Sequence, residues 1–400
     1  MKVLQINSVC GIGSTGRIAT DIDKILKSQG HESYIAFGRG NARDCDTTIK
    51  IGNQIDNYMH VAKTRLLDKH GFGSKKSTQE FINKIEVLNP DIIHLHNIHG
   101  YYINVELLFE YLKKVNKPVV WTLHDCWAFT GHCSHFDYVN CSRWETGCYS
   151  CSQKKNYPSS IFIDNSDNNY LKKKDIFMGV KNMTIVTPSK WLARLVKKSF
   201  LSEYPTKVIN NGIDLEVFKP TESKFREKYN LKNKFIILGV ASIWEERKGY
   251  EYFIELSKNI KIDEAIVLVG LTDKQIKNLP NNIIGISRTN SVRELAEIYS
   301  TADAFVNPTL EDNFPTTNLE ALACGTPIIT FNTGGSIECI DKSCGLIVEK
   351  GNLNELINTI EKVKKKGKLS YSQQCIQRAK NLYDKKDRFN EYVQVYIKTL

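Results

Sequence analysis

The stretch AFVNPTLEDNFPTTNLEALACGTPIIT, which runs from Ala304 to Thr330, carries the clearest structural signal in the chain. It starts with a short apolar run, passes through a polar turn, continues with a helical pattern and ends in a second apolar run. Two such runs joined by a helix are typical of parallel strands, because parallel strands cannot be connected by a short turn. The stretch therefore predicts one β-α-β unit of a parallel sheet.

The same alternation of apolar runs and helical patterns continues on both sides of this unit. In the first half of the chain we expect strands at 2–8, 33–38, 92–98, 119–124 and 184–188. In the second half we expect strands at 235–241, 265–270, 283–286, 304–306, 327–330 and 345–348. Two separate sets of strand-helix units predict an α/β protein with two doubly wound, Rossmann-like domains that face each other across a cleft.

The expected domain boundary lies in a segment broken by Pro205, by Asn210-Asn211-Gly212 and by Pro220. We expect an N-terminal domain at 1–204, which contains a cysteine-rich insertion at 126–160. A C-terminal domain should occupy 205–385. The last stretch, 386–400, is predicted to be a helix that could pack back on the N-terminal domain.

Composition and charge exclude several classes of protein. The chain is 41% hydrophobic and 25% charged, as in ordinary globular proteins, and no apolar run approaches the roughly 18 residues of a membrane span. With no signal-peptide pattern at the start, the 11 cysteines indicate a reducing cytoplasm. The net charge of +11 is concentrated in the first 200 residues, which hold 27 Lys and Arg against 18 Asp and Glu. That half is expected either to meet an anionic partner or to present a solvated, lysine-rich surface.

A glycine-rich loop, Gly11-Ile-Gly13-Ser-Thr-Gly16, follows the first expected strand and opens a helix. This is the glycine spacing of a dinucleotide-binding loop, and the N–H groups at a helix start attract phosphate. An NAD(P)-dependent oxidoreductase is one interpretation, although the second strand ends at Phe37-Gly38-Arg39 and not in an acidic residue. A basic nucleic-acid-binding protein is another interpretation of the charge.

The second half of the chain carries sharper motifs. Two cations and a glycine, Arg247–Gly249, stand at a strand-to-helix turn, where they suit a diphosphate. Asp312 and Asn313 sit where a helix N-cap is expected, with Pro315 near the first turn. Glu320, about two helical turns beyond Asp312, falls on nearly the same side. Two carboxylates placed in this way can bind hydroxyl groups at the two ends of an elongated ligand.

The order of these motifs resembles the family 4 (group 1) glycosyltransferases of the GT-B fold, the type that assembles bacterial capsules and exopolysaccharides. The resemblance covers essentially the whole chain. It rests on Lys248-Gly249, on the acidic pair Asp312 and Glu320, and on Thr122-Leu-His124-Asp125 at the end of a first-domain strand. The chain departs from the family where the first acid is Asp and not the commoner Glu. It departs again at Ser242, where many members have Arg.

The resemblance implies a retaining glycosyltransferase of the hexosyltransferase type. It would move a sugar from a UDP- or GDP-linked donor to a hydroxyl of a growing, lipid-linked polysaccharide, with no cofactor needed for catalysis. The implied catalytic residues are His124, Lys248, Asp312 and Glu320. The implied donor-binding residues are Gly13, Ser14, Arg247, Lys248, Asn313, Phe314, Pro315, Thr316 and Glu320. The acceptor side would comprise Thr15, Gly16, Arg17, His96 and Asp125.

The implied location is the cytoplasm, with no nucleic acid as a partner. The basic first half suggests a hypothesis of peripheral contact with the anionic inner leaflet of the cell membrane, through Lys63, Arg65, Lys69, Lys75 and Lys76 and separately through Arg194, Lys197 and Lys198.

The expected insertion contains four cysteines within 19 residues, Cys133, Cys141, Cys148 and Cys151. The group ends in Cys-x-x-Cys and has His132 and His135 close by, so it could form a structural zinc site. Reduced cysteines packed as small hydrophobic side chains around Phe136, Trp144 and Tyr149 would explain the same composition. Both interpretations remain open at this point.

Overall fold

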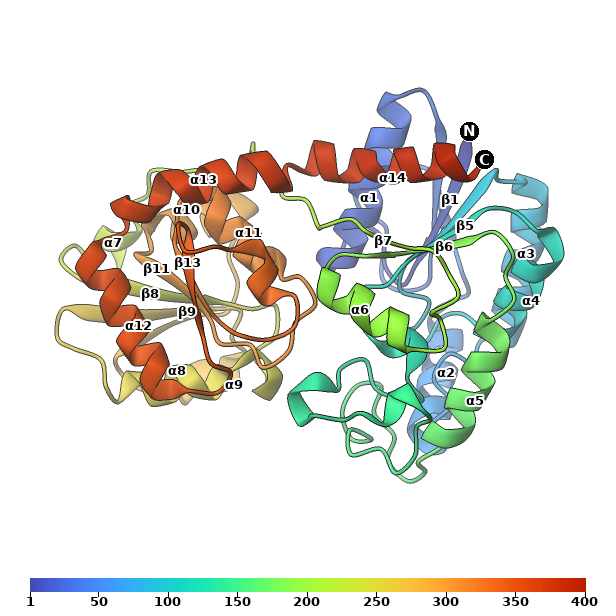
Figure 1. The fold of residues 1–400 in the computed structure, drawn as a ribbon, viewed down its shortest axis with the longest axis horizontal. Helices are drawn as coiled ribbons and strands as arrows, with labels where there is room; N and C mark the ends of the chain where they lie inside the picture. Colours follow the sequence, from blue (N-terminus) through green and yellow to red (C-terminus); the bar gives the residue numbers. More distant parts are fainter. The chain divides into compact units, whose positions relative to one another are not determined.

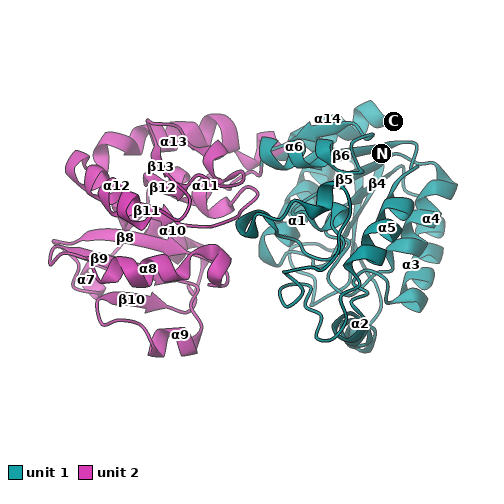
Figure 2. Ribbon diagram, turned by 60° about the horizontal axis from the view of Figure 1, so that its bottom comes forward, with its two compact units in different colours: residues 1–210, 389–400 teal, residues 211–388 magenta.

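The computed structural model describes residues 1–400, which fold into two compact units (Figure 2). Unit 1 consists of Met1–Asn210 together with Phe389–Leu400, and unit 2 consists of Asn211–Arg388. The chain therefore passes between the units twice, and the last twelve residues return to the unit in which the chain began.

No helix combines the length with the apolar character that crossing a bilayer requires.

The sheet of unit 1 has seven parallel strands in the order β3-β2-β1-β4-β5-β6-β7. The strands are β1 (Lys2–Asn7), β2 (Glu32–Phe37), β3 (Thr48–Lys50), β4 (Ile92–Leu95), β5 (Val119–Thr122), β6 (Met183–Thr187) and β7 (Thr206–Val208). The central five match the expected strands. The two edge strands, β3 and β7, were not predicted, because three residues are too few to carry a periodic pattern.

Helices cover both faces of this sheet (Figure 1). The helices of unit 1 are α1 (Gly13–Ser28), α2 (Gln54–Leu67), α3 (Lys75–Leu88), α4 (Val105–Val115), α5 (Ser166–Phe177), α6 (Lys190–Lys198) and α14 (Lys385–Thr399), and all but α2 contribute side chains to the cores against the sheet. Side chains alternate between the faces along each strand. Val3 packs in a core with Ile22 of α1 and Tyr396 of α14, whereas Leu4 packs in a larger core with helices such as α4. The chain's last helix thus helps to cover one face of the first unit's sheet.

The segment after β5 contains no long helix before α5. It is built from three 3-10 turns, η1 (Trp127–Phe129), η2 (Asp137–Val139) and η3 (Arg143–Glu145). A buried lysine of α5, Lys173, holds its beginning: its Nζ donates to the backbone oxygens of Trp127 at 2.8 Å and Thr130 at 3.0 Å. The same ammonium lies over the indole ring of Trp127, 3.5 Å from the ring centroid. Burial lowers the pKa of Lys173 to about 7.

The sheet of unit 2 has six parallel strands in the order β10-β9-β8-β11-β12-β13. The strands are β8 (Phe235–Val240), β9 (Glu264–Val269), β10 (Ile283–Ile286), β11 (Ala304–Asn307), β12 (Ile328–Phe331) and β13 (Gly345–Val348). All six match expected strands, since β8 to β13 are short, mainly apolar runs bounded by turn residues. The α/β class with two doubly wound parallel sheets is confirmed.

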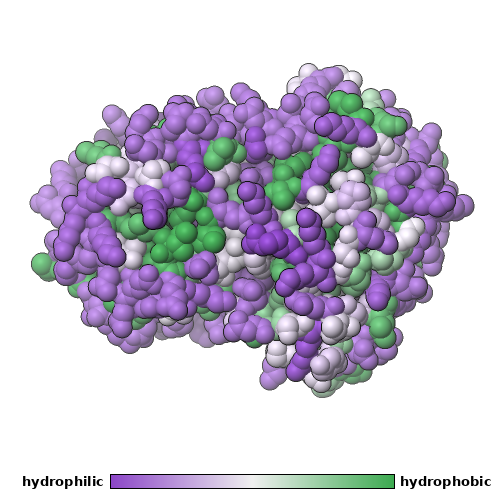
Figure 3. All heavy atoms as spheres, in the orientation of Figure 1, coloured by the Kyte–Doolittle hydropathy of each residue, from purple (hydrophilic) through white to green (hydrophobic).

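The helices of unit 2 are α7 (Phe225–Lys228), α8 (Tyr250–Ser257), α9 (Asp273–Lys277), α10 (Val292–Thr301), α11 (Thr316–Ala323), α12 (Leu353–Lys366) and α13 (Leu369–Tyr383). Two 3-10 turns, η4 (Glu246–Lys248) and η5 (Ser336–Cys339), stand near the carboxyl ends of strands. One large core joins sheet and helices. In the space-filling view, hydrophilic residues cover most of the face that is seen (Figure 3).

Candidate functional site

Both sheets reverse their strand order at one point. In unit 1, β1 lies between β2 and β4, and in unit 2, β8 lies between β9 and β11. The connections leave such a central strand toward opposite sides, so a crevice opens at the carboxyl ends of the two neighbouring strands, where α/β proteins bind ligands. The predicted site residues lie in the loops and helix starts that follow β1, β4 and β5 in unit 1 and β8 and β11 in unit 2.

In unit 2, the loop after β8 approaches the loop after β11 very closely. Lys248 ends the turn η4, and Gly249 has a φ of +77° before α8 begins. A Cβ at Gly249 would lie 2.1 Å from the backbone oxygen of Pro308, so this approach requires glycine. As a result Lys248 lies beside Asp312, and its Nζ donates a hydrogen bond to Asp312 Oδ2. Two motifs 64 residues apart thus form one cation–carboxylate pair.

The neighbouring cation, Arg247, has a different environment. Its Nη1 donates to the backbone oxygen of Glu311 at 2.8 Å, and its Nη2 pairs with Glu245 Oε1 at 2.9 Å. Its backbone oxygen accepts from the N–H of Leu310 at 2.8 Å. The side chain that was predicted to help Lys248 hold a diphosphate therefore also joins the two loops.

A third loop, after β12, holds the backbone of Asp312. The N–H of Gly335 donates to the backbone oxygen of Asp312 at 3.0 Å, and a Cβ at Gly334 would lie 2.0 Å from that same oxygen. Because its backbone is bound in this way, Asp312 does not start the helix. Helix α11 begins at Thr316 with Pro315 in the N-cap position, so the prediction of an N-cap at Asp312 or Asn313 was wrong.

Glu320 lies one turn into α11, and its side chain is buried. The hydroxyl of Tyr299 on α10 donates to Glu320 Oε2 at 2.8 Å, which holds the carboxylate in place. A buried carboxylate fixed in this way is suited to accept hydrogen bonds from hydroxyl groups. Phe314 faces the core, where its ring lies 5.8 Å from the ring of Tyr383.

In unit 1, the glycine-rich loop forms the start of α1. Gly11 has a φ of +68°, and a Cβ there would lie 2.2 Å from the backbone oxygen of Arg43. The loop closes with a hydrogen bond from the N–H of Gly11 to the oxygen of Gly16 at 3.1 Å. Of the predicted residues, Gly13, Ser14 and Arg17 are exposed, Thr15 is half-buried and Gly16 is buried. No side chain caps this helix start, which leaves its first N–H groups suited to an anion.

His124, at the carboxyl end of β5, has its tautomer set by a hydrogen-bonded chain. Gln5 Oε1 lies 3.0 Å from His96 Nε2, and because the oxygen can only accept, His96 Nε2 carries the proton. Burial holds the pKa of His96 well below its usual value, so the ring is neutral and its Nδ1 accepts. His124 Nε2, 3.2 Å from that Nδ1, is therefore the donor. Burial also lowers the pKa of His124 to about 4, so its Nδ1 is an acceptor suited to a sugar hydroxyl.

Behind this chain lies a second layer that the sequence did not reveal. The ring of His94 is tilted against that of His96, with 3.9 Å between the ring centroids. His94 Nδ1 lies 2.6 Å from the hydroxyl of Tyr396, and its Nε2 lies 2.8 Å from that of Thr122. Thr122 also contacts the hydroxyl of Tyr392 at 3.4 Å. On the strand side, the alternation of His94 and His96 is the signal that could have found this layer, because alternate residues of a strand share a face. The partner tyrosines, four residues apart on α14, were not assigned to it.

Asp125, the last residue of the same motif, is an oriented, charged carboxylate. Its Oδ2 lies 3.0 Å from His99 Nε2, and its Oδ1 accepts from the N–H of Trp127 at 2.9 Å. Burial alone would raise the pKa of Asp125, but the charge and hydrogen bond of His99 outweigh it and hold the pKa well below its usual range. His99 Nδ1 in turn lies 3.0 Å from the hydroxyl of Tyr157.

The four cysteines of the insertion do not form the predicted zinc site. They line one cavity of about 20 Å³, but no three His, Cys, Asp or Glu side chains in the chain are placed together so that they could hold a metal ion. All four are free thiols. The rings of Phe136 and Trp144 stack 4.9 Å apart against the same cavity. The arrangement favours the alternative interpretation, in which the thiols pack as small hydrophobic groups.

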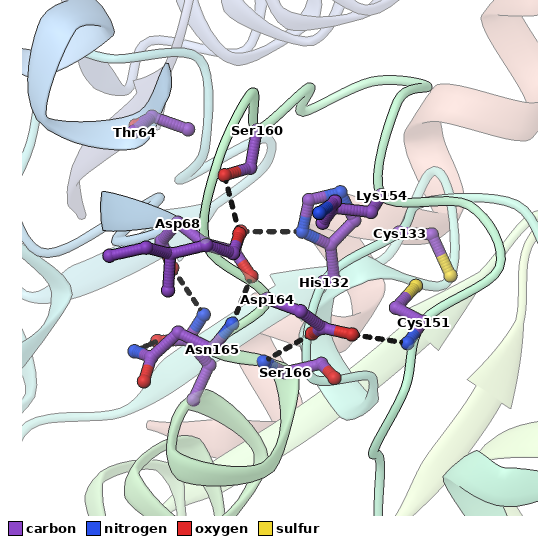
Figure 4. Close-up of polar contacts among 12 residues, drawn as sticks. Thr64, Asp68, His132, Cys133, Cys151, Lys154, Ser160, Asp164, Asn165 and Ser166 are labelled. Atoms are coloured by element: carbon purple, nitrogen blue, oxygen red, sulfur yellow. Dashed lines mark hydrogen bonds and ion pairs between the residues drawn. The ribbon is translucent and has the colours of Figure 1, made fainter. Parts of the chain in front are cut away.

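A buried ion pair organises this insertion. Asp68 stands at the end of α2. Its Oδ1 lies 2.5 Å from His132 Nδ1, and its Oδ2 accepts a hydrogen bond from the N–H of Asn165 at 2.8 Å (Figure 4). Its backbone oxygen accepts from Asn169 Nδ2 at 2.5 Å. One aspartate thus joins α2, the insertion and the start of α5. Nothing local in the sequence marks it, because the two charged partners are 64 residues apart.

Comparison with solved structures gives the fold. Sucrose-phosphate synthase from Thermosynechococcus elongatus is similar over 100% of this chain and 99% of its own, with a TM-score of 0.75 and 17% identity. HepE from Anabaena, solved in complex with UDP, is similar over 100% of both chains, with a TM-score of 0.68 and 15% identity. These similarities show the GT-B fold, in agreement with the expected fold.

Comparison with sequence families gives the family. Residues 15–217 match the model of Glycosyltransferase Family 4, and residues 221–382 match that of Glycosyl transferases group 1. The chain belongs to Glycosyltransferase Family 4 and is a glycosyltransferase of the type that builds capsules and other polysaccharides. It is 26% identical to the colanic acid biosynthesis glycosyl transferase WcaC of Escherichia coli K12, over 89% of each chain. This membership decides against the oxidoreductase and nucleic-acid-binding interpretations.

Proposed function

We propose that the enzyme transfers a sugar, with retention of anomeric configuration, from a UDP- or GDP-linked donor to a hydroxyl of a growing, lipid-linked surface polysaccharide. The observation that carries the proposal is the pair of Lys248 and Asp312 at the switch point of unit 2, with Glu320 fixed by Tyr299 one turn into the adjoining helix. This arrangement offers a cation for a diphosphate and carboxylates for hydroxyl groups of the ribose and the sugar.

On the donor side, each residue has a distinct role in the proposal. Departure of the diphosphate develops negative charge on its oxygens, which Lys248 stabilises, with Arg247 behind it. Glu320 binds the ribose hydroxyls. Asp312 and the backbone around Asn313 contact the transferred sugar. The half-buried positions of Lys248 and Asp312 support these roles, because the two charges interact more strongly with a ligand away from bulk water. Phe314, Pro315 and Thr316 shape the start of α11.

In unit 1, we assign His124 to the transferred sugar: its Nδ1 would accept a hydrogen bond from one of the sugar's hydroxyl groups. The neutral ring supports this role, since a histidine with a pKa of about 4 stays uncharged in the cytoplasm. The exposed start of α1, with Gly13, Ser14 and Arg17, would border the donor phosphate and the acceptor. The acceptor oxygen attacks from the face that the diphosphate leaves, and the departing phosphate oxygen takes its proton, so that retention needs no enzyme carboxylate as nucleophile.

The names of two relatives support a lipid-linked acceptor. One is the UDP-Gal:α-D-GlcNAc-diphosphoundecaprenol α-1,3-galactosyltransferase of Escherichia coli, 27% identical over 42% of this chain. The other is the N,N'-diacetylbacillosaminyl-diphospho-undecaprenol α-1,3-N-acetylgalactosaminyltransferase of Campylobacter jejuni, 30% identical over 37% of this chain. We propose an acceptor of the same kind here, met at the cytoplasmic face of the membrane.

Two alanine variants test the donor site. In a thermal-shift panel of UDP- and GDP-sugars, the wild type should be stabilised by one donor. Lys248→Ala and Glu320→Ala should lose that shift, and their transfer rate should fall about 100-fold or more. Lys258→Ala is the matched control, because this exposed lysine only pairs with Glu255 on the surface. Full donor binding and transfer in both site variants would contradict the proposal, and an inverted product anomer would contradict retention.

A further inference from the structure

Helix α2 presents its apolar residues to solvent and its polar residues to the protein. Ile55 is 72% exposed, Tyr58 65% and Met59 67%, whereas His60 and Thr64 are buried. At 100° per residue, residues 55, 58, 59, 62 and 66 fall on one outward stripe of the helix. An ordinary surface helix has the opposite arrangement, with its apolar stripe toward the core. The outward stripe therefore indicates a surface that is covered in use.

The segment that follows the insertion extends this stripe. The N–H of Ile161 donates to the backbone oxygen of Arg65 at 2.8 Å, which sets the segment Ile161–Ile163 beside the last turn of α2. Phe162, in the middle of that segment, is 71% exposed, and Leu66 on the helix is 48% exposed. The "α2 face" is defined here as Ile55, Tyr58, Met59, Ala62, Leu66, Ile161 and Phe162. Contiguous exposed apolar side chains of this kind mark an interaction surface.

The charges around the α2 face are positive. Arg65 and Lys69 are exposed on or next to the stripe, and Lys75 and Lys76 are exposed at the start of α3. Burial and the nearby charges of Lys69, Lys75 and Lys172 lower the pKa of Lys63. The one acidic side chain within α2, Asp56, is engaged in capping the helix start. An apolar stripe flanked by cations fits a surface that is anionic outside and apolar beneath.

We propose that the α2 face docks unit 1 on a lipid bilayer with anionic headgroups, with α2 lying in the plane of the interface. Ile55, Met59 and Phe162 would enter the boundary between headgroups and acyl chains, as the apolar face of an interfacial helix does. The cations would contact the headgroups, each contributing about fivefold in binding. This inference gives a physical surface to the membrane contact in the proposed function, but it does not depend on the chemistry of sugar transfer.

Vesicle binding tests the proposal with the full-length protein. The wild type should float with phosphatidylglycerol vesicles at low salt and much less with phosphatidylcholine vesicles. The triple variant Ile55→Gln, Met59→Gln, Phe162→Gln should bind the anionic vesicles about 100-fold more weakly, because three inserted side chains lose their apolar burial. The matched control is Ile262→Gln with Leu369→Gln, which changes two residues that are each 90% exposed in unit 2 and should leave vesicle binding unaltered.

Three outcomes would overturn the proposal: no vesicle binding by the wild type, equal binding by the triple variant, or an equal loss in the control. Sedimentation velocity tests the alternative that the α2 face binds a second copy of the chain. A wild-type dimer that the triple variant abolishes would assign the face to that second copy. The donor-induced thermal shift is measured on the same samples. It should be unaltered in the triple variant, so a failure of donor binding and a failure of membrane docking are distinguished.

Discussion

Replacing Asp68 by asparagine should destabilise unit 1 and release the insertion. Both side chains of the Asp68–His132 pair are fully buried, and Asp68 also bonds Asn165 (Figure 4). The backbone at residue 68 has a φ of 51°, which asparagine tolerates well, so Asp68→Asn removes the charge without backbone strain. Removing one partner of a buried ion pair costs about 3–5 kcal/mol, and the retained amide places the expected loss near 3 kcal/mol.

The pH dependence of this loss is the sharper measurement. Burial alone would lower the pKa of His132, but the hydrogen bond and charge of Asp68 outweigh it, and the folded pKa is raised. A raised histidine pKa adds stability that is fully present below the unfolded value of about 6.5 and is lost as the pH rises through the folded value. The difference between wild type and Asp68→Asn should therefore be larger at pH 6 than at a pH above the folded value.

Urea unfolding followed by tryptophan fluorescence measures this difference, because four of the five tryptophans lie in unit 1. The control is Asp167→Asn, an exposed aspartate in the first turn of α5, which should change stability by no more than about 0.5 kcal/mol. If Asp68→Asn unfolds within about 0.5 kcal/mol of the wild type at pH 6, or loses the same amount at both pH values, the reasoning about this pair is refuted.

Three further changes have definite expected results. Gly249→Ala would set a methyl group 2.1 Å from a backbone oxygen of the loop after β11, so the donor-induced thermal shift should disappear while the circular dichroism spectrum is retained. Tyr396→Phe removes the hydroxyl 2.6 Å from His94 Nδ1 and should cost about 1–2 kcal/mol in urea unfolding, whereas an unaltered midpoint would exclude this bond as a support. Asp303→Ala removes the carboxylate that lies 2.7 Å from the guanidinium of Arg226, and the free energy of unfolding of unit 2 should fall by about 2 kcal/mol.

Elements with a repeated local pattern could be predicted from the sequence. The inner strands β8, β9, β11 and β12 are largely buried on both faces, and the edge strands β10 and β13 are partly buried, so each of the six reads as an apolar run between turn residues. Helix α5 was not predicted, because its apolar positions are few and it is anchored by Lys173, a polar residue that the helical pattern does not mark as buried.

The predicted residues of the candidate site come from contiguous motifs, whereas contacts that the fold assembles were not predicted. Lys248-Gly249 and the segment from Asp312 to Glu320 are local signals, so the sequence could name them as candidates, and their roles stay predictions. The contact of Tyr396 with His94 joins residues 302 positions apart, and no local pattern contains it. The sequence left a zinc site and packed thiols open as two interpretations for the same reason, because cysteine spacing does not say which way the thiols point.

The return of α14 to unit 1 has a consequence for biosynthesis. Phe389, Tyr392, Val393 and Tyr396 fill one of the cores against the sheet of unit 1, yet they follow the whole of unit 2 in the chain. A ribosome makes residues in order from the N-terminus, so these side chains become available to unit 1 only after the whole of unit 2 has been synthesised. The contacts of Tyr392 with Thr122 and of Tyr396 with His94 can therefore form only after that point.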